Sequence, residues 1–205
     1  MARDNSPIVK QSRREGYALH PKAHKILVRK SGMPGQPSGS YQSKGSLYLT
    51  QLREKQKARR LYGLLEKQFA KLMVEAGKKD GLAGENLLQF LERRLDNVVY
   101  RSGFAVSRRA ARQLVGHGHF MLNGKRVDIP SIRVSTGDVI TVRPKSIKSE
   151  YFKHIDDVVS NSIQPTHSWL KTDVKKLTIT VTALPLRTDA EQDINEQLIV
   201  EYYSR

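Results

Sequence analysis

The chain has 205 residues, enough for one or two domains, and its hydrophobic share of 38% allows only a moderate core. Its 36 lysines and arginines outnumber 20 acidic residues and give a net charge of +16, a field suited to a polyanionic partner. Without cysteine it has neither disulfides nor thiolate metal sites, and no apolar run approaches the roughly 18 residues of a membrane span, so we expect a cytoplasmic protein.

Residues 1–45 are the most basic segment, with nine lysines and arginines against two acids, a local charge of +7. Four prolines, five glycines and few apolar residues predict that this segment does not fold alone. Two interpretations are open: a disordered tail, or an extended arm that becomes ordered as it neutralises RNA phosphates. We favour the arm, whose expected RNA contacts include Arg3, Lys10, Arg13, Arg14 and Lys22.

Residues 47–76 predict two helices separated by Gly63. The first, 47–62, carries a dense row of cations: Arg53, Lys55, Lys57, Arg59 and Arg60. A solvated charged face is the plain interpretation of such a row. However, Glu54 is the only local acidic partner, so we expect these five side chains to contact RNA.

Two helices are predicted in the centre of the chain. The first is amphipathic, with Leu87, Leu91 and Leu95 on one face, and stops at Gly103, because glycine accepts the left-handed conformation. The second begins at Ser107, a suitable N-cap, and ends at Gly116. Its outer face carries arginines at 108 and 112, which are one turn apart and are expected to project together into solvent.

A hairpin follows these helices. Asn123-Gly124 joins two short apolar-containing runs, 120–122 and 125–127, and this dipeptide is the strongest local signal for a type I′ turn. Further strands are predicted at 139–142, 169–170 and 177–184, with a polar helix at 145–162 between them and a final helix after Ile194. The fold class is therefore α+β, with helices on a small, mainly antiparallel sheet.

These elements suggest three parts: a basic extended arm at 1–45, a helical domain at 46–84 that is completed by 186–205, and an inserted RNA-binding module at 85–185. The acid-rich end of the chain, 156–205, has five basic and eight acidic residues, so the basic character belongs to the rest. In the module, the expected RNA contacts are Arg94, Arg101, Arg108, Arg109, Arg112, His117, Lys125 and Arg126.

Residues 91–120, LERRLDNVVYRSGFAVSRRAARQLVGHGHF, followed by LNGK and a GDVI strand, resemble the RNA-binding module of the bacterial-type small-subunit ribosomal protein four family. Further segments resemble that family in the same order and extend the match over nearly the whole chain: 12–16, 34–36, 52–56, 84–88 and 193–196. The chain is identified as a member of this family. The chain departs from the family in two places. Some members have a four-cysteine zinc cluster near the N-terminus, which this chain cannot form because it has no cysteine. After Pro34-Gly35-Gln36 the family usually continues with His-Gly and several basic residues, whereas here Lys44 is the only basic residue before the helix.

The resemblance implies a structural constituent of the small ribosomal subunit that binds the 5′ domain of 16S ribosomal RNA and nucleates assembly of the 30S particle. It also implies contact with small-subunit ribosomal protein five and other 30S proteins, an influence on translational accuracy, and a place near the path by which mRNA enters. The loop at 37–45 is the part that lies near this path in the family.

Three other functions fit these residues less well: catalysis, metal binding and a free-standing RNA-binding module. Arg94-Leu95-Asp96 also occurs at the catalytic aspartate of pseudouridine synthases, but here the triplet lies inside a helix of the module, so Asp96 is expected to pair with a neighbouring arginine. His20 and His24 alone are a weak metal signal, and no enzyme activity or cofactor is expected. A short heat-shock-type RNA-binding module is the second alternative, but such proteins lack the N-terminal arm and the 52–56 helix found here.

Overall fold

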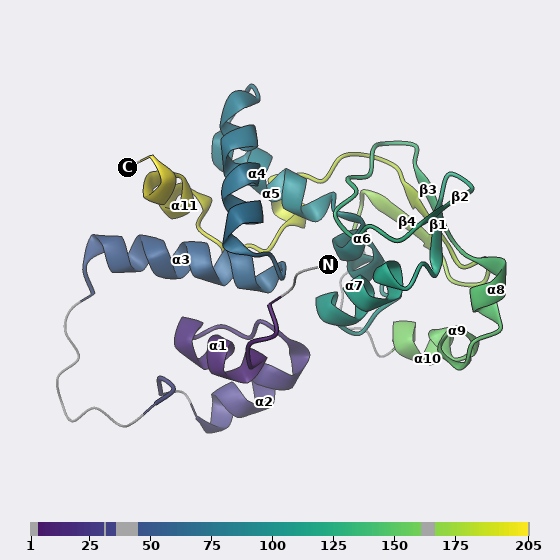
Figure 1. Cartoon of the computed structure of the whole chain (residues 1–205), viewed down its shortest axis with the longest axis horizontal. Helices are drawn as coiled ribbons and strands as arrows, with labels where there is room; N and C mark the ends of the chain where they lie inside the picture. Colours follow the sequence, from purple (N-terminus) through teal and green to yellow (C-terminus); the bar gives the residue numbers. More distant parts are fainter. Residues whose placement is uncertain (1–3, 31, 36–44, 161–166, 205) are drawn as a thin grey trace. The chain divides into compact units, whose positions relative to one another are not determined.

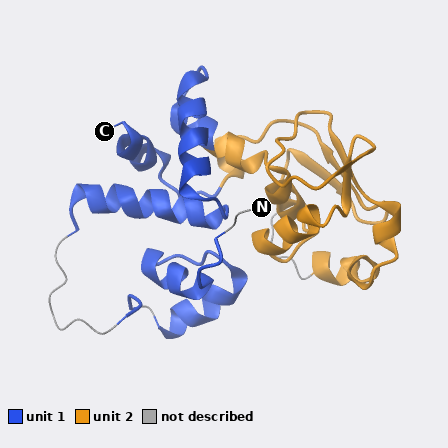
Figure 2. Ribbon diagram, viewed as in Figure 1, with its two compact units in different colours: residues 1–87, 191–205 blue, residues 88–190 orange. Residues whose placement is uncertain are grey.

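The computed structural model describes residues 4–30, 32–35, 45–160 and 167–204, and Figure 1 shows their helices and strands. The chain forms two compact units, coloured separately in Figure 2: residues 1–87 with 191–205, and residues 88–190. The chain enters the second unit within α5 (Ala83–Glu92) and leaves it after Ala190. The second unit is therefore an insertion in the sequence of the first.

The first unit is built from helices. Two of them, α1 (Ile8–Glu15) and α2 (Pro21–Arg29), lie in the segment that we expected to be an extended arm. The structure corrects that expectation, because this segment buries apolar side chains at Leu19 and Ala23, which the average composition of residues 1–45 conceals. Gly16 ends α1 with a φ of 63°, and the His20 side chain accepts a hydrogen bond from the first turn of α2.

The other helices of the first unit follow the predicted pattern. They are α3 (Leu47–Leu61), α4 (Glu66–Lys78) and, from the end of the chain, α11 (Glu196–Tyr203). Gly63 adopts a φ of 66° and separates α3 from α4, as predicted. The return of α11 brings Glu201 within 2.8 Å of Gln51 and packs the Tyr203 ring 6.3 Å from the ring of Phe69. Segments from the two ends of the sequence thus share one core.

The second unit contains a five-stranded antiparallel sheet in the order β2-β1-β3-β5-β4. Its strands are β1 (Phe120–Leu122), β2 (Lys125–Val127), β3 (Val139–Val142), β4 (Leu170–Asp173) and β5 (Thr178–Val181). Asn123 and Gly124 have φ values of 49° and 79°, which confirms the predicted type I′ hairpin. Together with the helices, the sheet confirms the α+β class.

The first predicted helix of the module is broken. Instead of one helix up to Gly103, the chain forms α5 and then α6 (Leu95–Arg101), with Arg93 and Arg94 between them. The segment 130–134 supplies the cause: the Leu95 amide donates to the Ile132 carbonyl at 2.8 Å, and the Val134 amide donates to the Arg93 carbonyl at 2.9 Å. These bonds satisfy backbone groups that a continuous helix would have paired internally.

Helices α6 and α7 (Arg108–Gly116) pack with the buried face of the sheet. Their common core includes Phe104, Phe120 and Trp169, each almost fully buried. The polar helix expected at 145–162 is divided into three short helices, α8 (Pro144–Ile147), α9 (Glu150–Lys153) and α10 (Ile155–Ser160), and a 3-10 turn covers Arg187–Asp189. Within the described ranges, no helix is both long and apolar enough to cross a bilayer.

Candidate nucleic-acid interface

The second unit presents a cationic face on α7 and on the β1–β2 hairpin. Ser107 caps α7, since its Oγ accepts a hydrogen bond from the Ala110 amide at 3.3 Å, as the sequence predicted. Ala111 and Val115 are fully buried, which turns the other side of the helix to solvent. Four of the predicted RNA contacts are exposed on these two elements: Arg109 and His117 on or next to α7, and Lys125 and Arg126 on β2.

Gly118 brings the hairpin against the end of α7. Its φ is 70°, and a Cβ added there would lie 2.7 Å from Nε of Arg126, so the arginine side chain rests directly on this glycine. The carboxyl end of a helix carries partial negative charge, which favours nearby cations. The contact with Gly118 therefore places the Arg126 side chain of β2 next to the end of α7, where His117 lies.

Arg143 belongs beside this face, and the sequence analysis missed it. Its amide donates to the His119 carbonyl at 2.8 Å, because β1 and β3 pair with Phe120 opposite Val142. The antiparallel pairing of the two predicted strands was the signal that could have found it. Burial, together with electrostatic repulsion from the neighbouring His117 and Arg143, holds the pKa of His119 below its usual value. His119 Nδ1 lies 3.0 Å from Ser146 Oγ and is part of the packing.

Contrary to the prediction, Arg108 and Arg112 do not project freely into solvent. Nη1 of Arg112 lies 3.2 Å from a carboxylate oxygen of buried Asp96, and Nε of Arg108 donates to the Asn97 side chain at 2.9 Å. The Arg108 guanidinium also covers the Tyr100 ring at 4.6 Å. Both arginines connect α7 to α6, because the fold places polar groups of α6 beneath them.

Two further predicted RNA contacts, Arg94 and Arg101, are buried. Arg94 pairs with Asp96 at 3.2 Å, which confirms that this aspartate pairs with a neighbouring arginine. Arg101 holds the fully buried Glu92 through two hydrogen bonds, at 2.8 and 3.0 Å, and Asn97 adds a third at 2.6 Å. These arginines neutralise internal carboxylates.

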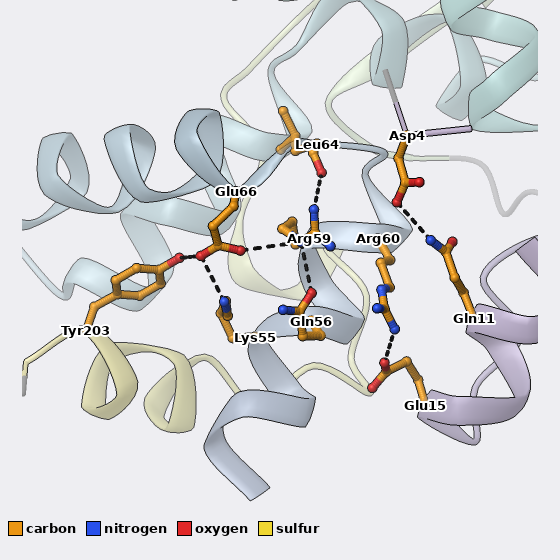
Figure 3. Close-up of polar contacts among 10 residues, drawn as sticks. All are labelled: Asp4, Gln11, Glu15, Lys55, Gln56, Arg59, Arg60, Leu64, Glu66 and Tyr203. Atoms are coloured by element: carbon orange, nitrogen blue, oxygen red, sulfur yellow. Dashed lines mark hydrogen bonds and ion pairs between the residues drawn. The ribbon is translucent and has the colours of Figure 1, made fainter. Parts of the chain in front are cut away.

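The cations of α3 are also paired, mostly with acids that are distant in sequence (Figure 3). The sequence showed Glu54 as the only local acidic partner, and it could not show these distant ones. Arg53 and Arg60 share Glu15 of α1, Lys55 and Arg59 share Glu66 of α4, and Lys57 binds Glu54 and the Asp193 carbonyl. The Glu15 side chain is 1% exposed, and this burial raises the pKa of its carboxyl despite the two arginines.

Glu66 is the centre of a second cluster, which Figure 3 shows between α3, α4 and α11. Lys55 Nζ and the Tyr203 hydroxyl each donate to Oε1 of Glu66 at 2.8 Å. Burial alone would raise the pKa of Glu66, but these hydrogen bonds and the charges of Lys55 and Arg59 hold it below its usual value. The Lys55 side chain is only 3% exposed and lies over the Tyr202 ring at 4.7 Å, so it is a structural residue.

In the first unit, the predicted RNA contacts that are exposed lie instead on the N-terminal helices. Lys10, Arg14 and Lys22 are exposed, whereas Arg13 donates to the carbonyls of Gly32 and Met33. Arg3 and the loop residues 37–44 lie outside the described residues. In the part of the chain that the structure describes, no cluster of histidine and acidic side chains could hold a metal ion.

Comparison with known proteins covers nearly the whole chain. Residues 3–92 match the model of the ribosomal protein S4/S9 N-terminal domain, and residues 93–140 match the S4 domain. The chain is 50% identical over 206 residues to small ribosomal subunit protein uS4 of Chloroflexus aurantiacus, and 48% identical over 211 residues to that of Heliobacterium modesticaldum. Each alignment covers 100% of both chains. This chain belongs to the uS4 family of small ribosomal subunit proteins.

Proposed function

We propose that the chain is a primary binding protein for 16S ribosomal RNA, which organises a helical junction in the 5′ domain and nucleates assembly of the 30S particle. As a member of the uS4 family, it is a structural constituent of the small ribosomal subunit in the cytoplasm, and it is not an enzyme. The S4 domain makes it an RNA-binding protein. The RNA that we assign to it is the 5′ domain of 16S ribosomal RNA, and the effect of binding is to begin assembly of the 30S particle.

One observation carries the proposal: the exposed cations from two elements that Gly118 brings together, on α7 and on the hairpin. Structured RNA presents mainly phosphates and 2′-hydroxyls, so a rigid basic face suits it better than side chains that read base edges. The buried ion pair of Asp96 with Arg112 supports α7 from below. It holds α6 and α7 in one arrangement before RNA arrives, which lowers the ordering cost of binding.

The N-terminal helices supply a second cationic region, with Lys10, Arg14 and Lys22 exposed on α1 and α2. Two units with separate basic surfaces can bind two RNA helices and hold their junction in one geometry. A protein that nucleates assembly must bind the RNA early and hold the junction in the geometry that later proteins need. Contact with small-subunit ribosomal protein five, an influence on translational accuracy and a position near the mRNA path rest on the family resemblance.

The test measures binding of the full chain to a 16S 5′-domain fragment across a range of salt concentrations. A variant with Lys125→Ala and Arg126→Ala removes two cations from edge strand β2. The matched control, Lys171→Ala with Lys175→Ala, removes two exposed cations from β4, the opposite edge of the sheet, and from the turn that follows it.

We expect the β2 variant to lower the slope of log affinity against log salt by roughly one unit for each lost phosphate contact, and the β4 variant to leave it unchanged. Equal slopes for both variants would remove the hairpin from the interface. Failure of the unaltered chain to prefer the 5′-domain fragment over an unrelated folded RNA of equal length would refute the proposed function itself.

A further inference from the structure

Strand β4 lies at one edge of the sheet. Its partner is β5, and among the described residues no strand pairs with its other side. Such an edge presents backbone N–H and C=O groups that can pair with another chain. The opposite edge, β2, is protected because its adjacent cations Lys125 and Arg126 repel a second copy of the same strand. In contrast, β4 carries charges of both signs.

The register of the sheet shows which backbone groups of β4 point outward. The Thr182 amide donates to the Trp169 carbonyl at 3.0 Å, so these two opposite residues form a hydrogen-bonded pair. Because bonded and non-bonded pairs alternate along antiparallel strands, Lys171 and Asp173 also bond with β5. Thr172 therefore turns its amide and its carbonyl to the open edge, and no described residue bonds to either group.

The side chains of β4 alternate between two faces. Leu170 and Val174 pack in the core, so Lys171 and Asp173 lie on the other face. Lys171 is exposed, and the Asp173 side chain is 43% exposed. The Asp173 carboxylate accepts from the Lys176 amide at 3.0 Å and lies 4.0 Å from Lys176 Nζ, an exposed ion pair that contributes little. Both charges of β4 are thus accessible to a strand that approaches the edge.

A second copy of β4 complements this edge in one register. A two-fold axis at Thr172 places the two Thr172 residues opposite each other, with two hydrogen bonds between antiparallel strands. The flanking positions then form non-bonded pairs, whose side chains come closest, and Lys171 of each copy faces Asp173 of the other. A shift of two residues opposes lysine to lysine or aspartate to aspartate, and a shift of one residue misaligns the bonding groups. Charge therefore selects the same register that pairs the Thr172 backbone.

We propose that β4 is a self-association edge: outside the ribosome, two copies of the chain pair through it and join their five-stranded sheets into one continuous sheet. Residues 156–205, which include β4, hold five basic and eight acidic residues, so their charge does not oppose a second copy as the rest of the chain does. Because β4 has only four residues, the interface is smaller than the roughly 1,200–2,000 Å² of stable complexes, and the dimer is weak. The inference does not depend on which RNA the chain binds.

The first experiment is sedimentation equilibrium of the full chain over a wide range of concentrations, in about 0.15 M salt to screen repulsion between the +16 chains. Lys171→Glu and Asp173→Lys each replace both cross-strand ion pairs with like charges. We expect each variant to raise the dimer dissociation constant by about tenfold or more, because the symmetry makes one substitution act twice. The matched control, Lys148→Glu, makes the same charge change at an exposed site after α8 and is expected to leave the dissociation constant unchanged.

Mixing the two charge variants tests the register itself. In a mixed dimer, Glu at position 171 of one copy faces Lys at position 173 of the other, and Asp173 of the first faces Lys171 of the second, so opposite charges meet again. We expect the mixture to associate as the unaltered chain does, although each variant alone is mostly monomeric. Failure of the mixture to associate would overturn this register. Asp173→Lys also removes the acceptor of the Lys176 amide. Should it fail to fold, Asp173→Asn keeps an acceptor, and unchanged association of that variant would be the contrary result.

Thr172→Pro tests the backbone pairing. Proline removes the amide that donates across the two-fold axis, and the sheet tolerates it because this amide does not face β5. We expect loss of the dimer with an unchanged circular dichroism spectrum. A dimer that persists in this variant and in both charge variants lies elsewhere on the molecule and overturns the inference. An unaltered chain that stays monomeric at every concentration would also overturn it, and would leave the edge to a strand of another protein.

Discussion

At the scale of single residues, carboxylates decide which of the many cations remain available to RNA. Glu15, Glu66, Glu92 and Asp96 are each held by arginine or lysine side chains that the sequence presents as candidate RNA contacts. Glu15, Glu92 and Asp96 are buried, and buried pairs contribute little net stability, but loss of one partner leaves an uncompensated charge. The Glu66 side chain is half-exposed, so its ion pairs are partly screened by solvent. A substitution at such a cation therefore tests the fold first and RNA binding second.

Arg112 and Arg109 allow this distinction to be measured on one helix. Arg112→Ala removes a partner of buried Asp96 and is expected to lower the free energy of unfolding by about 1–3 kcal/mol. Arg109→Ala changes an exposed side chain and is expected to stay within about 0.5 kcal/mol of the unaltered chain. Urea denaturation of both variants provides the check. Similar losses at the two positions would show that the Asp96 pair is not structural.

Glu66 predicts a dependence of stability on pH. Its pKa is lower in the folded chain than the ordinary value of 4.5, so its contribution to stability is complete above that value and is lost as pH falls through the folded pKa. Glu66→Gln is expected to flatten the acid side of the stability curve below about pH 4.5. The exposed Glu85 of α5, changed to Gln, is the control. Parallel curves for the two variants would argue against the Glu66 cluster.

At the scale of elements, local sequence preferences set where the helix and the hairpin of the cationic face begin and end. The Ser107 cap starts α7, the Asn123-Gly124 turn sets the hairpin register with Leu122 opposite Lys125, and Gly118 admits Arg126. The sheet places β2 at an edge, where its two exposed cations also discourage pairing with another chain.

Ser107→Ala is expected to reduce the free energy of unfolding by about 1 kcal/mol, because the Ala110 amide loses its acceptor. Ser107→Asp retains an acceptor and is expected to lose less. Thermal unfolding of the full chain checks both variants. If alanine and aspartate had the same effect, the cap would not be the reason for the loss.

At the scale of the whole molecule, the first unit depends on both ends of the chain. α11 contributes Tyr203 to the Glu66 cluster and Glu201 to the Gln51 hydrogen bond, whereas the sheet lies wholly within 88–190. The two units are therefore expected to differ in their response to truncation after Ala190.

Removal of residues 191–205 is expected to expose α3 and α4 and to leave the sheet intact. Amide hydrogen exchange would then show faster exchange in α3 and α4, and unchanged protection in β1, β3 and β5. Unchanged protection in α3 would contradict a role for α11 in that core.

The sequence by itself determined what depends on near neighbours or on total charge. The Gly63 break, the Ser107 cap, the type I′ turn, the alternation of β5 and the polyanionic partner were all predictable, because each follows from local backbone preference or from composition. The family resemblance depended on the order of such local motifs along the chain.

Only the tertiary structure decided which cations are available and where the long helix breaks. Glu15 lies 45 residues from Arg60, and the carbonyl that accepts from the Leu95 amide comes from the loop before β3. Local periodicity contains no information about such partners, since electrostatic and hydrogen-bond pairing depends on distance in space. For the same reason, two short helices formed where composition indicated an extended arm, and Arg143 reached the basic face unpredicted.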